Sequence, residues 1–256
     1  MVLIFVGFFL LMASVPYAVA NADGADGSSV TLTKPLQFAD GAIEGALSAR
    51  DAADLMSRPV WMGGNDTEGV ELTSPEDGSK RTVRACGDYR GLKASSWFAS
   101  TTYDTTMEGF FIGMCGVLEI IAGACPAKRS YVSNPVVSVG DLSLLPPTVL
   151  PAMTPEHQER LRQLGKSGVT VAELVDPHAE STHTGAFRAE YRYEGMEQIL
   201  QETARGDFNC DGLEDLLVFA ASYATGGSYR SYDTLVLTRC SKAAKFTLPA
   251  DGCAWR

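Results

Sequence analysis

Residues 206–220 read GDFNCDGLEDLLVFA, and this stretch decides the fold that the C-terminal half is expected to adopt. Oxygen-bearing side chains stand at Asp207, Asn209, Asp211 and Asp215, and an apolar run follows them directly. Small polar residues around a glycine are typical of a tight turn, whereas a short run of branched apolar residues is typical of a buried strand. The pattern therefore predicts a turn that leads straight into a β-strand.

The same four side chains have the spacing of calcium ligands. A calcium ion takes about six to eight oxygen ligands, and alternate positions of a tight loop turn their side chains to one side. A glycine in the loop lets the backbone reverse, so that the next carbonyl can also face the ion. The position at which an EF-hand carries its closing glutamate falls in the apolar run, so the loop is not an EF-hand. The predicted Ca²⁺ ligands are Asp207, Asn209, Asp211, Leu213 (through its carbonyl) and Asp215.

The stretch GDFNCDGLEDLLVF resembles the calcium loop of FG-GAP and VCBS-type repeats, whose pattern is Gly-Asp-x-Asn-Gly-Asp-Gly, then an Asp and a hydrophobic strand. Asp207, Asn209, Asp211 and Asp215 match the ligand positions of that family. The sequence departs from the pattern at Cys210, which replaces a glycine, and it holds a single copy, whereas a propeller needs about four to eight blades. The resemblance therefore implies a calcium-clamped β-hairpin. The alternative is an Asx-rich turn without an ion, which a disulfide at Cys210 would favour.

The composition is that of a folded, acidic protein. The 256 residues are 45% hydrophobic, so the chain can bury a sizeable core, and long intrinsic disorder is excluded. The formal net charge of −10 argues against nucleic acids and anionic membrane surfaces, because like charges repel. We therefore expect no nucleic-acid partner.

Residues 1–20 (MVLIFVGFFLLMASVPYAVA) have the features of a secretory signal peptide. They carry no charged side chain and end in Ala-Val-Ala, which has the small-x-small form of a cleavage site. The usual basic residues at the start are missing, which leaves open a retained anchor or an earlier start. The prediction is a periplasmic or secreted protein with no membrane span after cleavage and a flexible leader over residues 21–40.

The six cysteines of an exported chain are expected to pair. Three precede a Pro-rich connection at residues 146–153 and three follow it, so at least one bridge joins the two parts if all six pair. Free, buried cysteines are the alternative. Cys115 and Cys125 should not pair with each other, because a continuous helix would hold them about 15 Å apart. The six are Cys86, Cys115, Cys125, Cys210, Cys240 and Cys253.

Residues 41–145 are expected to form a mixed α/β part. An amphipathic helix is predicted over residues 41–56, and a second, strongly apolar helix over residues 107–124. Thr105 and Glu108 have the spacing of a capping box at the start of the second helix. Charged residues inside this helix favour a buried core helix over a membrane span.

Residues 154–256 are expected to be mostly β-structure and to carry the calcium loop. A short helix should start at Thr154 and stop at Gly165. Alternating apolar and charged residues, together with apolar runs, predict strands. Those strands are residues 187–193, 215–223 and 232–239. The predicted class is therefore α+β, with a mixed N-terminal part that contains a buried hydrophobic helix and a mostly antiparallel β C-terminal part.

These features favour an exported calcium-binding protein that acts without enzymatic activity, as a binding, inhibitor or immunity-type module. The sequence holds no nucleophile elbow and no phosphate-binding loop. Aromatic residues around the last hairpin could contact a protein or glycan partner. The alternatives are a secreted hydrolase of wall or glycan material with structural calcium, which needs two facing carboxylates in a cleft, and a structural envelope component. The aromatic residues are Phe219, Tyr223, Tyr229 and Tyr232.

Overall fold

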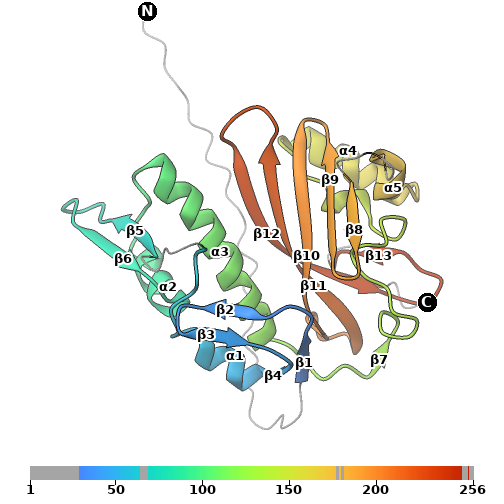
Figure 1. Ribbon diagram of the computed structural model, residues 1–256, viewed down its shortest axis with the longest axis horizontal. Coiled ribbons are helices and arrows are strands. Elements are labelled where there is room, and N and C mark those ends of the chain that lie inside the picture. The colour runs from blue at the N-terminus through green and yellow to red at the C-terminus, as the bar shows by residue number, and fades with distance from the viewer. Residues whose placement is uncertain (1–28, 64–68, 177–178, 180–181, 250–252, 254–256) are drawn as a thin grey trace, which may run out of the picture.

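A computed structural model describes residues 29–63, 69–176, 179, 182–249 and 253 of the chain. The predicted signal peptide lies outside these residues, and so does the first part of the predicted leader. Helices and antiparallel strands both build the fold, so the predicted α+β class is confirmed. Figure 1 shows a large sheet in the C-terminal half, helix α3 (Thr102–Ala122) beside it, and small hairpins of the N-terminal part beyond that helix.

Strands from both halves of the chain form the large sheet. They are β1 (Ser29–Leu32), β4 (Ala46–Ser48), β7 (Arg129–Ser130), β8 (His183–Gly185), β9 (Arg188–Tyr193), β10 (Met196–Gly206), β11 (Leu213–Ala224), β12 (Arg230–Arg239) and β13 (Phe246–Thr247). The order is β13-β12-β11-β10-β1-β4, and neighbours along it are antiparallel. One end of β10 pairs with β9 and the other end with β1. The short β7 runs parallel to the start of β11.

Small hairpins and short helices complete the described structure. The hairpins pair β2 (Leu36–Phe38) with β3 (Gly41–Ile43), and β5 (Val70–Thr73) with β6 (Lys80–Val83). The remaining helices are α1 (Ala49–Leu55), α2 (Cys86–Ala94), the 3₁₀ turn η1 (Pro147–Val149), α4 (Pro155–Lys166) and α5 (Val171–Leu174).

The sheet carries a hydrophobic core on each face. Successive residues of a strand point to opposite faces. On β11, Leu217 belongs to the core that contains α3, whereas Leu216 and Val218 belong to the core that contains α4 and α5. Because β11 is covered on both faces, its sequence is an almost continuous apolar run.

The helix predicted over residues 41–56 is only partly right. Its first half forms β3 and β4, and α1 begins at Ala49. Ser48 caps α1 with a hydroxyl that accepts the N–H of Asp51 at 3.1 Å, and the Asp51 carboxylate accepts the N–H of Ser48 at 3.2 Å. Pairing of β4 with β1 overrides the local helix preference. The predicted leader over residues 21–40 is also too long, because β1 and β2 lie inside it.

Helix α3 is the apolar helix that the sequence predicts, but it starts earlier. Thr101 caps it with a hydroxyl that accepts the N–H of Asp104 at 3.0 Å. The predicted capping pair, Thr105 and Glu108, lies inside the helix. Glu108 instead accepts the hydroxyl of Tyr89 at 2.7 Å, so a contact with α2 accounts for this acidic residue in an apolar helix.

By length and composition alone, α3 is the one helix in the described part of the chain that could cross a membrane. Core helices of soluble proteins pass the same test. In the structure α3 packs against α1 and β12, and Phe111, Val117 and Ile121 are buried in the core. One third (33%) of the most apolar 18-residue stretch of α3 is buried inside the protein.

Glycines let α3 approach the sheet closely. A Cβ atom added at Gly113 would lie 2.7 Å from the Phe219 ring, and one added at Gly116 would lie 3.0 Å from the Thr234 hydroxyl. That hydroxyl donates to the Gly113 carbonyl at 2.9 Å. These glycines of the apolar helix therefore form its contact with β11 and β12.

Replacement of Gly113 by alanine should destabilise the protein. Alanine improves helix propensity by about 1 kcal/mol, but the new methyl group must displace the Phe219 ring, and overpacking costs about 1–3 kcal/mol. We expect a net loss of about 1 kcal/mol in the free energy of unfolding, measured by urea denaturation. Gly91→Ala is the matched control, because its Cβ would meet open space and should add about 0.5–1 kcal/mol. Equal effects of the two changes would contradict this account of the helix contact.

The Pro-rich connection at residues 146–153 is not where one core ends and the other begins. Buried residues that precede the connection, from Val132 to Leu145, already belong to the core of α4 and α5. Two buried arginines of the sheet bind the chain ahead of the connection, between Tyr131 and Val137. Arg205 donates to the carbonyls of Val132 and Val137 at 3.0 and 2.9 Å, and Arg239 donates to a neighbouring carbonyl at 2.9 Å.

The predicted strands of the C-terminal part are confirmed as β9, β11 and β12, with ends that shift by at most two residues. Thr154 caps α4 as predicted, and the helix ends at Lys166, one residue beyond Gly165. Strand β10 was not predicted, although it leads into the acidic loop.

Disulfides join all six cysteines. The pairs are Cys86–Cys115, Cys125–Cys210 and Cys240–Cys253. The second pair links the N-terminal part to the acidic loop, so the predicted crossing bridge is confirmed, and Cys115 and Cys125 have different partners as expected. Three disulfide bonds indicate an extracellular or periplasmic protein rather than a cytoplasmic one, because cytosolic thiols are kept reduced.

Candidate metal centre

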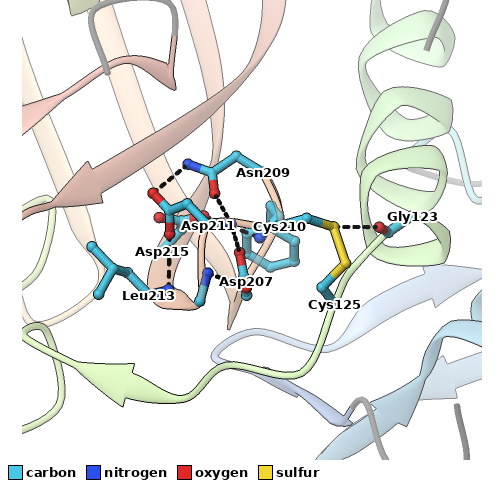
Figure 2. The surroundings of a disulfide bond; sticks show 10 residues. Gly123, Cys125, Asp207, Asn209, Cys210, Asp211, Leu213 and Asp215 are labelled. Atoms are coloured by element: carbon cyan, nitrogen blue, oxygen red, sulfur yellow. Dashed lines mark hydrogen bonds between the residues drawn. A yellow bond between two sulfur atoms is a disulfide. The ribbon is translucent and has the colours of Figure 1, made fainter. Parts of the chain in front are cut away.

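The acidic loop is the turn of an antiparallel hairpin between β10 and β11 (Figure 2). Gly206 and Asp215 face each other as the last pair of the hairpin, and residues 207–212 connect the two strands. Gly212 has a φ of 87°, a left-handed conformation that favours glycine and reverses the chain. The predicted turn into a strand is confirmed.

Asp207 lies buried at the base of the loop and accepts N–H groups from its far end. The residue is 1% exposed. Its Oδ1 accepts the N–H of Asp211 at 3.1 Å, and its Oδ2 accepts that of Gly212 at 2.7 Å. Burial raises the pKa of Asp207, and the Asp211 carboxylate adds to the rise. A carboxylate offers about four lone-pair positions, so these bonds leave positions for a cation.

The side chains of Asn209 and Asp211 contact each other. The Asn209 amide donates to Asp211 Oδ2 at 3.2 Å, and its Oδ1 accepts the N–H of Asp211 at 3.0 Å. Asp211 Oδ1 accepts the N–H of Leu213 at 2.8 Å. Leu213 itself lies in β11, with a buried side chain and a main chain paired to Arg129 of β7.

Asp215 is fully buried, and one of its oxygens has no hydrogen-bond partner. Its Oδ2 accepts the N–H of Phe208 at 3.0 Å, whereas Oδ1 has no partner among the described residues. Burial raises the pKa of Asp215 to about 7, and the Asp211 and Asp207 carboxylates add to the rise. The Thr238 hydroxyl and the Phe208 N–H oppose it. The neighbouring charges are therefore negative, and a buried anionic oxygen without a donor or a cation is costly.

A segment that follows α3 clamps the loop through main-chain bonds. The N–H of Cys125 donates to the Asp207 carbonyl at 2.8 Å. The N–H groups of Lys128 and Arg129 donate to the Gly212 carbonyl at 2.9 and 3.1 Å. Both ends of the loop are thus bonded to one segment that is distant in sequence. The motif alone does not predict that this segment contacts the loop.

Cys210, where the loop departs from the family pattern, is tied to the same segment by its disulfide with Cys125 (Figure 2). Its φ of 61° lies in the left-handed region, which favours glycine. The disulfide that would favour an ion-free Asx turn is therefore present. It nevertheless joins the loop at a residue in a left-handed conformation, which glycine adopts readily.

Thr238 of β12 is a part of the site that sequence reasoning missed. The residue is 2% exposed, its hydroxyl accepts the Asn209 amide at 3.0 Å, and it lies beside the Asp215 carboxylate. It stands far from the motif in sequence, and the sheet alone brings it to the loop.

The residues fit calcium by their chemistry more than by their present geometry. In the part of the chain that the structure describes, no three His, Cys, Asp or Glu side chains are arranged to hold a metal ion. Closure around an ion would require side chains of the loop to rotate. The predicted set still consists of hard oxygen donors, which calcium prefers, without the imidazole or thiolate donors that suit zinc and copper.

Comparison with known proteins assigns no family. No protein-family model, curated protein or solved structure matches the chain. The likeness to FG-GAP and VCBS-type loops thus rests on one short stretch.

Away from the loop, a surface depression of about 530 Å³ lies between α1 and α2. Asp54 and Asp88 are among the residues that line it, and both are exposed. A glycosidase needs one carboxylic acid whose pKa is raised, typically by an apolar pocket. Asp54 and Asp88 lie at the surface and not in an enclosed pocket.

The aromatic residues of the last hairpin mostly pack against α3. Phe219 and Tyr232 lie 5.7 and 5.4 Å from the Phe110 ring, measured between centroids. Arg230 covers the Tyr223 ring at 5.4 Å. Tyr229 is 46% exposed. Of the four aromatic residues, it is therefore the one most open to a partner, in the turn between β11 and β12.

Proposed function

We propose that the protein is an exported calcium-binding protein that acts as a non-enzymatic binding or inhibitor module. The observation that carries the proposal is the buried Asp215 Oδ1, which makes no hydrogen bond with the described residues, although the Thr238 hydroxyl lies beside the carboxylate. Asp207 and Asp211 add negative charge on the same side. A divalent cation at this point would offset two of the three negative charges of Asp207, Asp211 and Asp215, and it would fill the open positions of Asp207 and Asp215.

In this proposal calcium orders the acidic-loop end of β11 and β12, and a partner contacts the opposite end of the same two strands. The loop connects β10 to β11, and the bond between Asn209 and Thr238 extends its influence to β12. The exposed tip with Tyr229 is the proposed contact for a protein or glycan. The exposed setting of Asp54 and Asp88 supports binding over the alternative, a secreted hydrolase with structural calcium.

Calorimetric titration should detect one calcium ion per chain, with a dissociation constant of about 10⁻⁴ to 10⁻³ M, which is typical of extracellular modules. Asp207→Ala should abolish the heat, because it removes a buried ligand whose backbone bonds also shape the loop. Asp211→Ala should do the same.

Glu214→Gln is the matched control for these variants. Glu214 lies next to the loop and loses the same single charge, but its carboxylate accepts the hydroxyl of Ser133 at 2.6 Å and is not a proposed ligand. The calcium affinity of the Glu214→Gln variant should stay within about threefold of that of the natural protein. Unchanged heat in Asp207→Ala and Asp211→Ala, or no heat in the natural protein, would remove the calcium assignment.

A further inference from the structure

We propose that calcium binding and the Cys125–Cys210 disulfide stabilise each other, so that reduction of this bond weakens the calcium site. The inference rests on the proposed calcium function of the loop. It concerns how that site is regulated, and it follows from where the bond meets the loop.

The disulfide is attached at the centre of the proposed ligand set. Cys210 lies directly between Asn209 and Asp211, so a change in its backbone moves both of these residues. Its φ of 61° is unfavourable for an L-residue with a side chain. We infer that the disulfide bond to Cys125 stabilises this backbone conformation.

The rest of the clamp does not depend on the disulfide. The N–H of Cys125 holds the Asp207 carbonyl, and the N–H groups of Lys128 and Arg129 hold that of Gly212. Reduction therefore releases the middle of the loop while both ends stay attached. The expected consequence is a looser ligand set in a protein that remains folded.

A reductant can reach this disulfide. Cys210 is exposed and Cys125 is half-buried, whereas Cys86 and Cys115 are 0% and 3% exposed. A thiolate of a dithiol attacks one sulfur, the S–S bond breaks, and a mixed disulfide forms. The second thiol of the reagent then displaces the cysteine. Two electrons and two protons pass to the protein as two cysteine thiols, and the dithiol leaves as a cyclic disulfide.

Thermodynamic linkage makes the effect reciprocal. If reduction weakens calcium binding by some factor, calcium must disfavour reduction by the same factor. Couplings of this kind typically amount to about 5- to 150-fold. Reduction removes one of several attachments of the loop. We therefore expect it to weaken calcium binding roughly tenfold.

The first test compares calcium affinities by calorimetry. Cys125→Ser/Cys210→Ser should bind calcium roughly tenfold more weakly than the oxidised natural protein. Cys125→Ser/Cys210→Gly should recover part of the loss, because glycine adopts a positive φ without a tie. Cys86→Ala/Cys115→Ala removes a different disulfide and should leave the affinity within about twofold.

The second test uses the natural protein and so does not depend on how the variants fold. Dithiothreitol is added with calcium or with a chelator, and free thiols are mapped by alkylation and peptide analysis. Calcium should lower reduction of Cys125–Cys210 and leave Cys86–Cys115 unchanged. Equal reduction of Cys125–Cys210 in both conditions, or equal affinity in the serine variant, would overturn the linkage while the calcium site stands. Oxidised natural protein that takes up no calcium would instead overturn the proposed function.

Discussion

In calcium-free buffer, the Asp215→Asn variant should be more stable than the natural protein at pH 7.5, by about 4 kcal/mol, and close to it at pH 4. The pKa of Asp215 is raised to about 7 by burial, from 3.8. The folded protein therefore keeps a proton that the unfolded chain releases near pH 3.8, and stability falls as the pH rises from about 4 to 7. At about 1.4 kcal/mol per pKa unit, the loss approaches 4 kcal/mol. Asparagine has the same shape and carries no charge, so it escapes this loss.

Calcium should narrow the difference between the two proteins at pH 7.5. The natural protein should gain about 2.7 kcal/mol when free calcium exceeds the dissociation constant by about 100-fold, because only the folded state offers the site. The asparagine variant should gain less, because it offers the ion an amide oxygen in place of a carboxylate. Urea denaturation of both proteins at pH 4, 5.5 and 7.5, with and without calcium, measures all of these differences. Burial raises the pKa of other acids as well, such as Glu202 and Asp233, so the quantity to compare is the difference between the proteins. A difference that does not change with pH would contradict the environment assigned to Asp215.

Replacement of Arg205 by leucine should cost about 3–5 kcal/mol of unfolding free energy. Arg205 donates to Glu202 at 2.7 Å, and both side chains are buried, at 7% and 0% exposure. Burial already raises the pKa of Glu202, and Arg205 opposes that rise. Without the arginine, the carboxylate loses its cation, and the carbonyls of Val132 and Val137 each lose one hydrogen bond.

An exposed ion pair provides the control for the Arg205 change. Arg90 bonds Glu119 at 2.7 Å, but its side chain is 59% exposed, so Arg90→Leu should cost less than about 1 kcal/mol. The double change Glu202→Leu/Arg205→Leu should recover part of the loss, because it leaves no unpaired buried charge. Urea denaturation at pH 7.5 gives all three values. A loss as small for Arg205→Leu as for Arg90→Leu would show that the buried pair does not support the segment after β7.

Patterns confined to one element were readable from the sequence. Apolar runs and alternation place β9, β11 and β12, and the polar turn before an apolar run gives the hairpin of the acidic loop. Strand β10 escaped prediction because some of its buried positions carry polar residues. The side chain of Gln198 donates to the Val149 carbonyl, and Glu202 pairs with Arg205. Val149 lies elsewhere in the fold and Arg205 is a charged residue of β10 itself, so the sequence shows only polar residues where a strand would bury apolar ones.

The candidate site also has one part that the sequence predicts and another part that only the fold reveals. The spacing of Asp207, Asn209, Asp211 and Asp215 belongs to one loop and is visible in the sequence. The contributions of Thr238 and of the segment from Cys125 depend on the sheet and on the end of α3. The parity of the cysteines required a crossing bridge, but it could not say that this bridge would enter the loop itself.

The place of β1 in the sheet bears on when the molecule can fold. A growing chain emerges from its N-terminus, yet β1 lies between β4 and β10, and Thr31 pairs with Arg205. An isolated pair of short strands is marginal in water, so β1 and β4 wait until most of the polypeptide has been synthesised. Contacts between such distant residues slow folding. A ribosome that stalls before β10 would therefore release a chain unable to complete its sheet.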